Sequence, residues 1–403
     1  MATKLRIQAD RIVVGPSTSN RGGLEIVERA MIEVDAAGNI ALIGDPPIDA
    51  VTARTIHAPL VTAGLVDAHT HAAWAGSRHG EYAMRMAGAD YVAIAAAGGG
   101  IVNSHRAVAE TSEDDLARIL VARLRRMARQ GVTTLEIKSG YGLTPELELR
   151  QLRAIARAAE RKDVPRVVAT FLALHALPPE RRDSRAAYVD EMIALLPEIA
   201  RQRLAAYVDA YVDAHAFTVD EARRLGQRAR ELGLGVRLHV GQFSDVGGAE
   251  LAAELGAASV DHVEHVSAAG VAALAKAGTA VVLLPVASFT LRQEPPPVSI
   301  LRDAGLSLVV ASDANPGTAP TESLPLAMAL AVRSYGLTPE EALLGATAHA
   351  ARSLGRPELG VVAVGSPADL VLWDHPHEQA IVQPWGVARA RAVLRAGEVL
   401  IEA

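Results

Sequence analysis

The sequence predicts an α/β protein, a (β/α)8 barrel of the TIM type with a small β-sandwich domain formed by both chain ends. Eight short apolar segments rich in β-branched residues recur along the middle of the chain, and stretches with helical spacing lie between them. The two ends carry short alternating strands joined by Gly or Asn turns, without helices. Regular alternation of strands and helices is typical of a parallel barrel.

The eight predicted barrel strands follow one another in chain order. They are LVDAHTH from residue 65, VTTLEIKSG from 132, RVVATFLALHA from 166, YVDAYVDAH from 207, VRLHVG from 236, SVDHVEHV from 259, TAVVLLP from 279 and LSLVVASDAN from 306. Good helix formers with helical apolar spacing occupy residues 114–131, after the first strand, and 219–233, after the fourth. The active site of such a barrel lies at the carboxyl ends of its strands.

The change in pattern sets the predicted domain boundaries. Residues 61–358 form the predicted barrel, and residues 1–60 together with 359–403 form the predicted β-sandwich domain. The alternative is two separate terminal hairpins, which the sequence leaves open.

Composition limits the classes of partner. The net charge is −6 and basic residues do not cluster, so the electrostatic surface that nucleic acid needs is missing. The most apolar segment, residues 277–291, is too short for a membrane helix and contains Pro285, which favours a buried strand followed by a loop. The N-terminal residues lack the apolar core of a signal peptide, so we expect a cytoplasmic protein without nucleic-acid or membrane partners.

Residue types that bind metal ions end several predicted strands. His69 and His71 end the first strand and point to the same side, because side chains alternate along a strand. The third, fifth, sixth and eighth strands end at His175, His239, His262 and Asp313. The chain has no cysteine, so a metal must be held by histidine and carboxylate.

Zinc or iron would suit a site made of His69, His71, His239 and Asp313. Such an ion lowers the pKa of a bound water, and Asp313 is the predicted general base. His262 lies one strand further round and is predicted to polarise a substrate carbonyl or to hold the attacking water; the alternative is a structural histidine. Lys138 ends the second strand, where an ion pair and a catalytic role are both open.

The longer motifs resemble one family. They are DAHTHAAWAGSR (67–78), AAGGGI (96–101), EIKSGYGL (136–143), QFSDVGGAELAAELGAASVDHVEH (242–265), SDANPGTAPTES (312–323) and GSPADLVLW (365–373). Together they resemble the amidohydrolase superfamily and, within it, the imidazolonepropionase family, whose members open the imidazolone ring in histidine degradation. Barrels of this superfamily with two metals commonly bridge them with a carboxylated lysine on the fourth strand. None of the four lysines lies there, so one metal ion, divalent or trivalent, is predicted.

The resemblance also implies how a small carboxylate-bearing heterocycle would bind. Arg78 would grip its propionate, and the ring site would be lined by Tyr141, His175, Gln242, Asn315, Gly317 and Thr318. The implied reaction is hydrolysis of the cyclic amide of 4-imidazolone-5-propanoate to N-formimidoyl-L-glutamate by a homodimer. Without the family pattern, Arg78 would be interpreted as a solvated loop residue and Tyr141 as a packed core aromatic.

Some positions depart from the family pattern and leave alternatives open. Val240 and Gly241 follow the histidine of the fifth strand, Ala314 precedes the NPG segment, and Asp213 and His215 follow the fourth strand; these changes could alter the pocket and its substrate. A deaminase on a related nitrogen heterocycle is the nearest alternative, although such enzymes place a glutamate where Gln242 stands, and an amide does not titrate. A non-catalytic barrel-fold binding protein is the other alternative.

Overall fold

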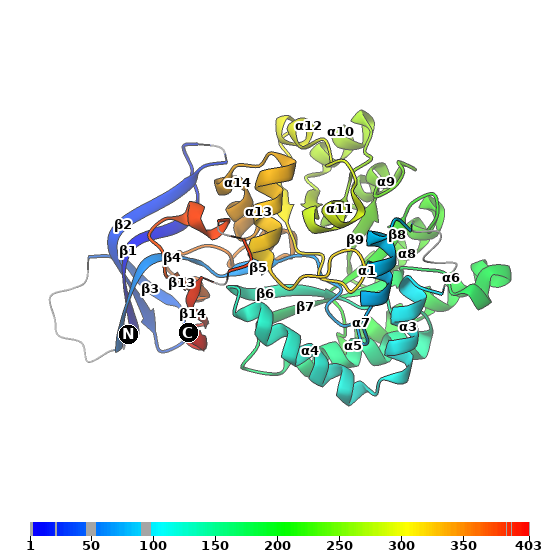
Figure 1. Ribbon diagram of the computed structural model, residues 1–403, viewed down its shortest axis with the longest axis horizontal. Helices are drawn as coiled ribbons and strands as arrows, with labels where there is room; N and C mark the ends of the chain where they lie inside the picture. Colours follow the sequence, from blue (N-terminus) through cyan, green and yellow to red (C-terminus); the bar gives the residue numbers. More distant parts are fainter. Residues whose placement is uncertain are drawn as a thin grey trace.

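The computed structural model describes residues 3–20, 22–45, 54–89, 98–383, 385–387 and 389–402. Figure 1 shows two parts, a large α/β part and a smaller β part that contains both ends of the chain. The first two residues of the AAGGGI motif lie outside the described residues. Among the residues that are described, no helix combines the length and the apolar character that crossing a membrane requires.

The large part contains the eight predicted strands, which are confirmed in one parallel sheet. In chain order they are β5 (Leu65–Asp67), β6 (Val132–Lys138), β7 (Arg166–Leu174), β8 (Tyr207–Val212), β9 (Gly235–Val240), β10 (Ser259–His262), β11 (Ala280–Leu283) and β12 (Leu308–Val310). Each strand pairs with the next one in the chain. Every residue of β6 is buried, as expected for a strand covered on both faces.

The first and last strands meet just beyond their carboxyl ends. Thr70 and Ala314 form a parallel bridge there. The Asp313 backbone N–H donates to the His69 carbonyl oxygen over 3.1 Å, and the His71 N–H donates to the Ala314 carbonyl oxygen over the same distance. This closure brings the predicted ligands from the two ends of the barrel sequence side by side.

Helices surround the strands. They are α1 (His79–Met86), α3 (Ile101–Glu110), α4 (Glu113–Ala128), α5 (Pro145–Ala159), α6 (Arg185–Ala194), α7 (Leu196–Gln202), α8 (Val219–Glu231), α9 (Gly248–Leu255), α10 (Ala268–Ala277), α11 (Pro285–Leu291), α12 (Val298–Asp303), α13 (Leu324–Tyr335), α14 (Pro339–Gly345) and α15 (Ala348–Ser353). The two helices expected after the first and fourth strands are α4 and α8. Thr218 and Glu221 form a capping box that starts α8.

The expected loop after the seventh strand is wrong. Pro285 begins helix α11 at its first turn, where a missing N–H and a fixed φ cost nothing. The most apolar segment of the chain is thus a buried strand followed by a short helix, whose residues Pro285 to Ser288 are buried.

The small part is one seven-stranded sheet, and the expectation that both chain ends contribute to it is confirmed. Its strands are β1 (Thr3–Pro16), β2 (Leu24–Asp35), β3 (Ile40–Gly44), β4 (Arg54–Ala63), β13 (Leu370–Trp373), β14 (Ala390–Arg395) and β15 (Glu398–Glu402). The alternative of two separate hairpins is wrong, because β4 pairs antiparallel with β13. The sheet has its own buried apolar cluster, which includes Ile7, Ile32 and Leu370. Our domain boundaries after residues 60 and 358 remain a prediction.

Candidate metal centre and active site

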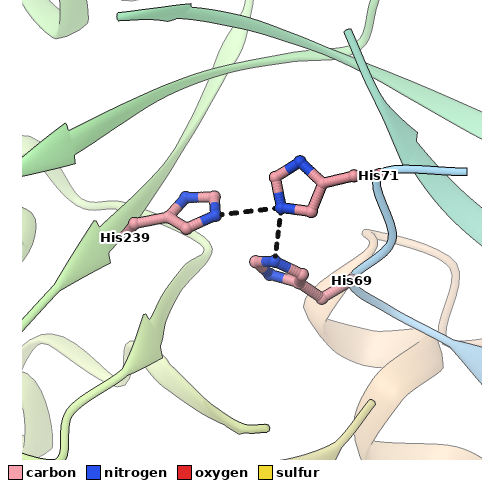
Figure 2. A group of neighbouring side chains, drawn as sticks. All are labelled: His69, His71 and His239. Carbon is pink, nitrogen blue, oxygen red and sulfur yellow. Dashed lines mark hydrogen bonds between the residues drawn. The ribbon is translucent and has the colours of Figure 1, made fainter. Parts of the chain in front are cut away.

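Three histidines converge at the carboxyl end of the barrel. The Nε2 atom of His71 lies 3.3 Å from Nε2 of His69 and 3.4 Å from Nε2 of His239, so the three rings point toward one another (Figure 2). Asp313 Oδ1 lies 3.4 Å from Nε2 of His69 and 3.5 Å from Nε2 of His71. All four side chains are buried.

Buried carboxylates orient two of these rings from behind. Nδ1 of His69 lies 2.7 Å from an Asp261 oxygen, and Nδ1 of His239 lies 3.0 Å from an Asp209 oxygen. A proton held at Nδ1 of His69 and of His239 would leave their Nε2 lone pairs directed to the centre of the cluster, which is how imidazoles bind a metal ion. Burial and the imidazoles of His175, His69 and His239 also lower the pKa of His71 well below its ordinary value.

The spacing of the four atoms fits a tetrahedral ion. Ligand atoms about 2.0–2.1 Å from zinc, arranged tetrahedrally, lie roughly 3.3–3.4 Å from one another. The observed separations of 3.3, 3.4, 3.4 and 3.5 Å agree with that arrangement. The donor set of three imidazoles and one carboxylate suits zinc or iron.

A buried ion-pair network lies directly beneath the histidines. Nζ of Lys138 lies 2.8 Å from an Asp209 oxygen, 2.9 Å from Glu136 and 3.4 Å from Asp261, and all four side chains have no solvent exposure. Burial disfavours the charged amine, yet these three carboxylates raise the pKa of Lys138 above its ordinary value. Of the two possibilities open for Lys138, the structure favours the ion pair, which balances the carboxylates that orient the ligand histidines.

Nearly all the predicted site residues, including three of the four in the cluster, line one pocket. They are His71, Arg78, Tyr141, His175, His239, Gln242, His262, Asp313, Asn315 and Thr318. The two exceptions are His69, which lies fully buried beneath the pocket, and Gly317, whose backbone packs against Arg78. Charged, aromatic and amide side chains predominate in this lining, which suits a small polar molecule.

Comparison with known proteins now places this arrangement in a family. A family model described as "Amidohydrolase family" matches residues 60–400. The chain is 44% identical over 382 residues to an imidazolonepropionase of Maricaulis maris, which covers 93% of this chain and 94% of that protein. It is 42% identical over 387 residues to an imidazolonepropionase of Paracoccus denitrificans, with 94% and 96% covered. The chain belongs to the imidazolonepropionase family of amidohydrolases.

Solved structures agree on the fold of this imidazolonepropionase family member. A triazine hydrolase variant matches with a TM-score of 0.73 at 18% identity, covering 99% of this chain and 94% of that one. An adenosine deaminase from Xanthomonas campestris with bound zinc matches with the same TM-score and identity, covering 99% and 93%. At such low identity, these matches show the shared fold alone.

Arg78 is buried at the edge of the imidazolonepropionase-type pocket and is held in place. Its Nε donates to Glu81 over 2.7 Å, and Glu81 also accepts from the Gly100 N–H over 3.0 Å and from the Asn103 amide over 2.9 Å. Although burial opposes the charge on Glu81, these donors lower its pKa. Gly317 leaves room for the guanidinium, because a Cβ there would lie 2.2 Å from Arg78 Nη1. A solvated loop arginine, which was the alternative, does not fit this arrangement.

Asn315 lines the pocket, as the resemblance implies, but its side-chain amide is bonded to its own turn. Its Oδ1 accepts from the backbone N–H groups of Gly317 over 2.8 Å and Thr318 over 2.7 Å, and its Nδ2 donates to the Asp313 carbonyl oxygen over 2.7 Å. Both ends of the amide therefore hold the turn that carries Gly317 and Thr318.

His175 and Tyr141 line the pocket next to each other, with their ring centres 5.4 Å apart. Nδ1 of His175 donates to the Gly140 carbonyl oxygen over 2.7 Å, and burial together with the neighbouring His239 lowers the pKa of His175 to about 4. The ring is therefore neutral at pH 7 with a lone pair on Nε2. Burial also raises the pKa of Tyr141 above its ordinary value, so this hydroxyl keeps its proton.

The positions that depart from the family pattern do not line the pocket. Asp213 binds the neighbouring loop, accepting from the Phe243 N–H over 2.9 Å and from the Ser244 hydroxyl over 2.6 Å. Gly241 has a φ of +65°, and a Cβ on it would lie 2.3 Å from the His265 carbonyl oxygen. Val240 and Ala314 are buried in the barrel wall, and His215 is exposed. These residues therefore shape the loops around the pocket rather than its lining.

Three lining residues were not predicted from the sequence: Ile101, Tyr211 and Phe243. The Tyr211 hydroxyl donates to Gln242 Oε1 over 2.8 Å, so it contacts a predicted residue directly. The sequence contains an indication that Tyr211 faces the site: it lies two residues after Asp209 on β8 and therefore on the same face of that strand.

Proposed function

We propose that the protein hydrolyses the cyclic amide bond of 4-imidazolone-5-propanoate to give N-formimidoyl-L-glutamate, as a step of histidine degradation. The observation that carries this proposal is a buried guanidinium, Arg78, in the same pocket as the cluster of His71, His239 and Asp313. A planar, permanently charged fork is suited to a carboxylate, and the ligand cluster is suited to amide hydrolysis. The curated imidazolonepropionases that match this chain support the same substrate.

One zinc or iron ion would be held by His69, His71, His239 and Asp313. When bound, it would lower the pKa of a water molecule and polarise the amide carbonyl. Asp313 would take a proton from the attacking water and return it to the departing ring nitrogen, so that one water is added across the broken C–N bond. His262, on the next strand round, would stabilise the oxyanion that develops on the carbonyl oxygen.

The other pocket residues would orient the substrate. Arg78 would bind the propionate, and the proton-bearing hydroxyl of Tyr141 would donate to the ring or to its carbonyl. The Nε2 lone pair of His175 would accept from a ring N–H. Gln242, fixed by Tyr211, together with Thr318, would complete the ring site, and Gly317 would leave room for Arg78. Asn315 would act by holding the turn beneath it.

Incubation with 4-imidazolone-5-propanoate tests the proposal. We expect loss of the ring absorbance and formation of N-formimidoyl-L-glutamate, identified by mass spectrometry. Asp313→Asn should abolish turnover, and Arg78→Ala should mainly raise KM. If the wild-type protein leaves this compound intact and opens another cyclic amide, the substrate assignment is wrong. Release of ammonia from an aminated heterocycle would instead favour a deaminase.

Three further expectations belong to this proposal. They are a single metal ion in each chain, a homodimer and a cytoplasmic location, and they remain predictions. Elemental analysis of the purified protein tests the first, and light scattering tests the second.

A further inference from the structure

A sharp reversal of the backbone at the end of β10 turns Glu264 back into the protein. His262 and Val263 have φ values of 84° and 62°, a region that residues with a Cβ rarely adopt. Hydrogen bonds from the Val263 N–H to the Val240 carbonyl and from the His265 N–H to the Gly241 carbonyl hold the reversal. As a result, the side chain of Glu264 is only 1% exposed. Strained backbone of this kind commonly serves a functional site.

One oxygen of Glu264 is fixed from behind. The Ser288 hydroxyl on α11 donates to Glu264 Oε1 over 2.6 Å, and the Tyr335 hydroxyl, at the end of α13, lies 2.6 Å from the same Ser288 oxygen. Because the single proton of Ser288 is used on Glu264, Tyr335 must donate to Ser288. Burial and the charge of Glu264 raise the pKa of Tyr335 well above its ordinary value, so this donor is retained.

The other oxygen of Glu264 faces His262. Glu264 Oε2 lies 3.6 Å from Nδ1 of His262. Both atoms are buried, and neither has a hydrogen-bond partner among the residues that the structure describes. Leaving two such atoms unpaired is costly, whereas a small rotation of the ring would join them.

We propose that Glu264 is a positioning residue for His262: it accepts the Nδ1–H of the ring and thereby directs Nε2 into the pocket toward the reacting carbonyl group. Tyr335 and Ser288 hold the carboxylate in the orientation that this requires. The inference rests on the proposed function, in which His262 stabilises the oxyanion. A carboxylate that orients a catalytic imidazole from its far nitrogen is a common arrangement in hydrolases.

Kinetics of two substitutions test this role. Glu264→Gln keeps an oxygen that can accept the Nδ1–H but loses the negative charge, so kcat should fall by only about 10-fold. Glu264→Ala removes the acceptor, and kcat should fall about 100-fold. KM should change by less than about threefold in both, because Arg78 still binds the substrate. Glu378 is a buried glutamate in the small part of the protein, where it binds Arg11. Glu378→Gln is therefore the matched control and should leave kcat unchanged.

A double-mutant cycle separates positioning from a structural effect. In a His262→Ala background, Glu264→Ala should lower kcat by less than about twofold, because the ring that it orients is gone. Equal losses in both backgrounds would overturn the proposal.

Thermal unfolding gives a readout that needs no substrate. The fall in Tm of the double variant should be clearly smaller than the sum of the two single shifts, since the two side chains interact. Additive shifts would overturn the pairing even in an active enzyme. Failure of the wild-type protein to open the imidazolone ring would instead overturn the proposed function, and the unfolding cycle would still test the pairing.

Discussion

Gly317 offers the sharpest test of the carboxylate site, because it controls the position of Arg78 without contacting the cluster of ligands. A Cβ at residue 317 would lie 2.2 Å from Nη1 of Arg78 and 2.5 Å from its Cζ. The φ of Gly317 is not in the left-handed region, so alanine is compatible with the backbone there. The three closest contacts of the added Cβ of Gly317→Ala are all with the guanidinium of Arg78, so the strain falls mainly there.

The size of the effect follows from this geometry. An ordinary contact requires about 3.5 Å, so the guanidinium must move by more than about 1 Å. That movement breaks its alignment with Glu81, whose oxygen lies 2.7 Å from Arg78 Nε. Loss of one charge-assisted hydrogen bond to the substrate costs about 1.5–3 kcal/mol, which corresponds to a rise in KM of about 10- to 100-fold. kcat should stay within about threefold, because the lost contact is made in the ground state and the transition state alike.

Initial rates over a range of substrate concentrations provide the assay. Gly80→Ala is the matched control, since Gly80 lies two residues from Arg78 in α1 and a Cβ there meets no atom within 4 Å. Its KM should equal that of the wild-type protein. If Gly317→Ala also keeps the wild-type KM while Arg78→Ala raises it strongly, the packing of Arg78 against Gly317 does not matter for binding and the reasoning is refuted.

Three further predictions concern the buried cluster. In urea titrations, Lys138→Met should lower the free energy of unfolding by about 3–5 kcal/mol, because three buried carboxylates lose their shared partner. Lys276→Met is the control and should have almost no effect, because Lys276 is exposed. Burial opposes the charge of Asp209, but His239 and Lys138 lower the pKa of its carboxyl group from 3.8 to about 2. In the metal-free protein this group should therefore contribute about 2 kcal/mol to the free energy of unfolding above pH 4, and this contribution should be lost as the pH falls toward 2. Asp209→Asn should flatten this part of the profile, and parallel profiles would contradict the assignment. A chelator should abolish activity and lower the Tm, and zinc or iron should restore both at one ion per chain; activity that survives complete metal removal would contradict the metal site.

The sequence was sufficient for the barrel and for the convergence of the ligands. The strand ends were predictable because β-branched apolar runs stop at His71, His239 and Asp313, and the carboxyl ends of parallel strands share one side of a barrel. The resemblance to a family then drew attention to Arg78. Neither step required knowledge of side-chain contacts.

The residues that orient the site could not be predicted in the same way. Glu264 lies in the segment SVDHVEHV that was predicted as the sixth strand, but β10 ends at His262. The positive φ values of His262 and Val263 then turn Glu264 back to the interior. Asn315 was assigned to the ring site by the resemblance to the family, although its amide is used by its own turn. The roles of Glu264 and Asn315 depend on backbone conformation and on which hydrogen-bond partners a side chain chooses, and the order of residue types along the chain does not determine either.

The interior of the barrel explains why the site is supported by charges rather than by apolar packing. Glu136, Asp209 and Asp261 belong to β6, β8 and β10, which are alternate strands, and residues from alternate strands form one layer inside a barrel of this kind. Branched apolar side chains usually fill such a layer. Here it holds carboxylates that reach the Nδ1 atoms of two ligand histidines, and a buried lysine then becomes necessary to balance them. The orientation of the ligands and the stability of the barrel therefore depend on the same buried network, so substitutions in that layer should affect metal affinity and unfolding together.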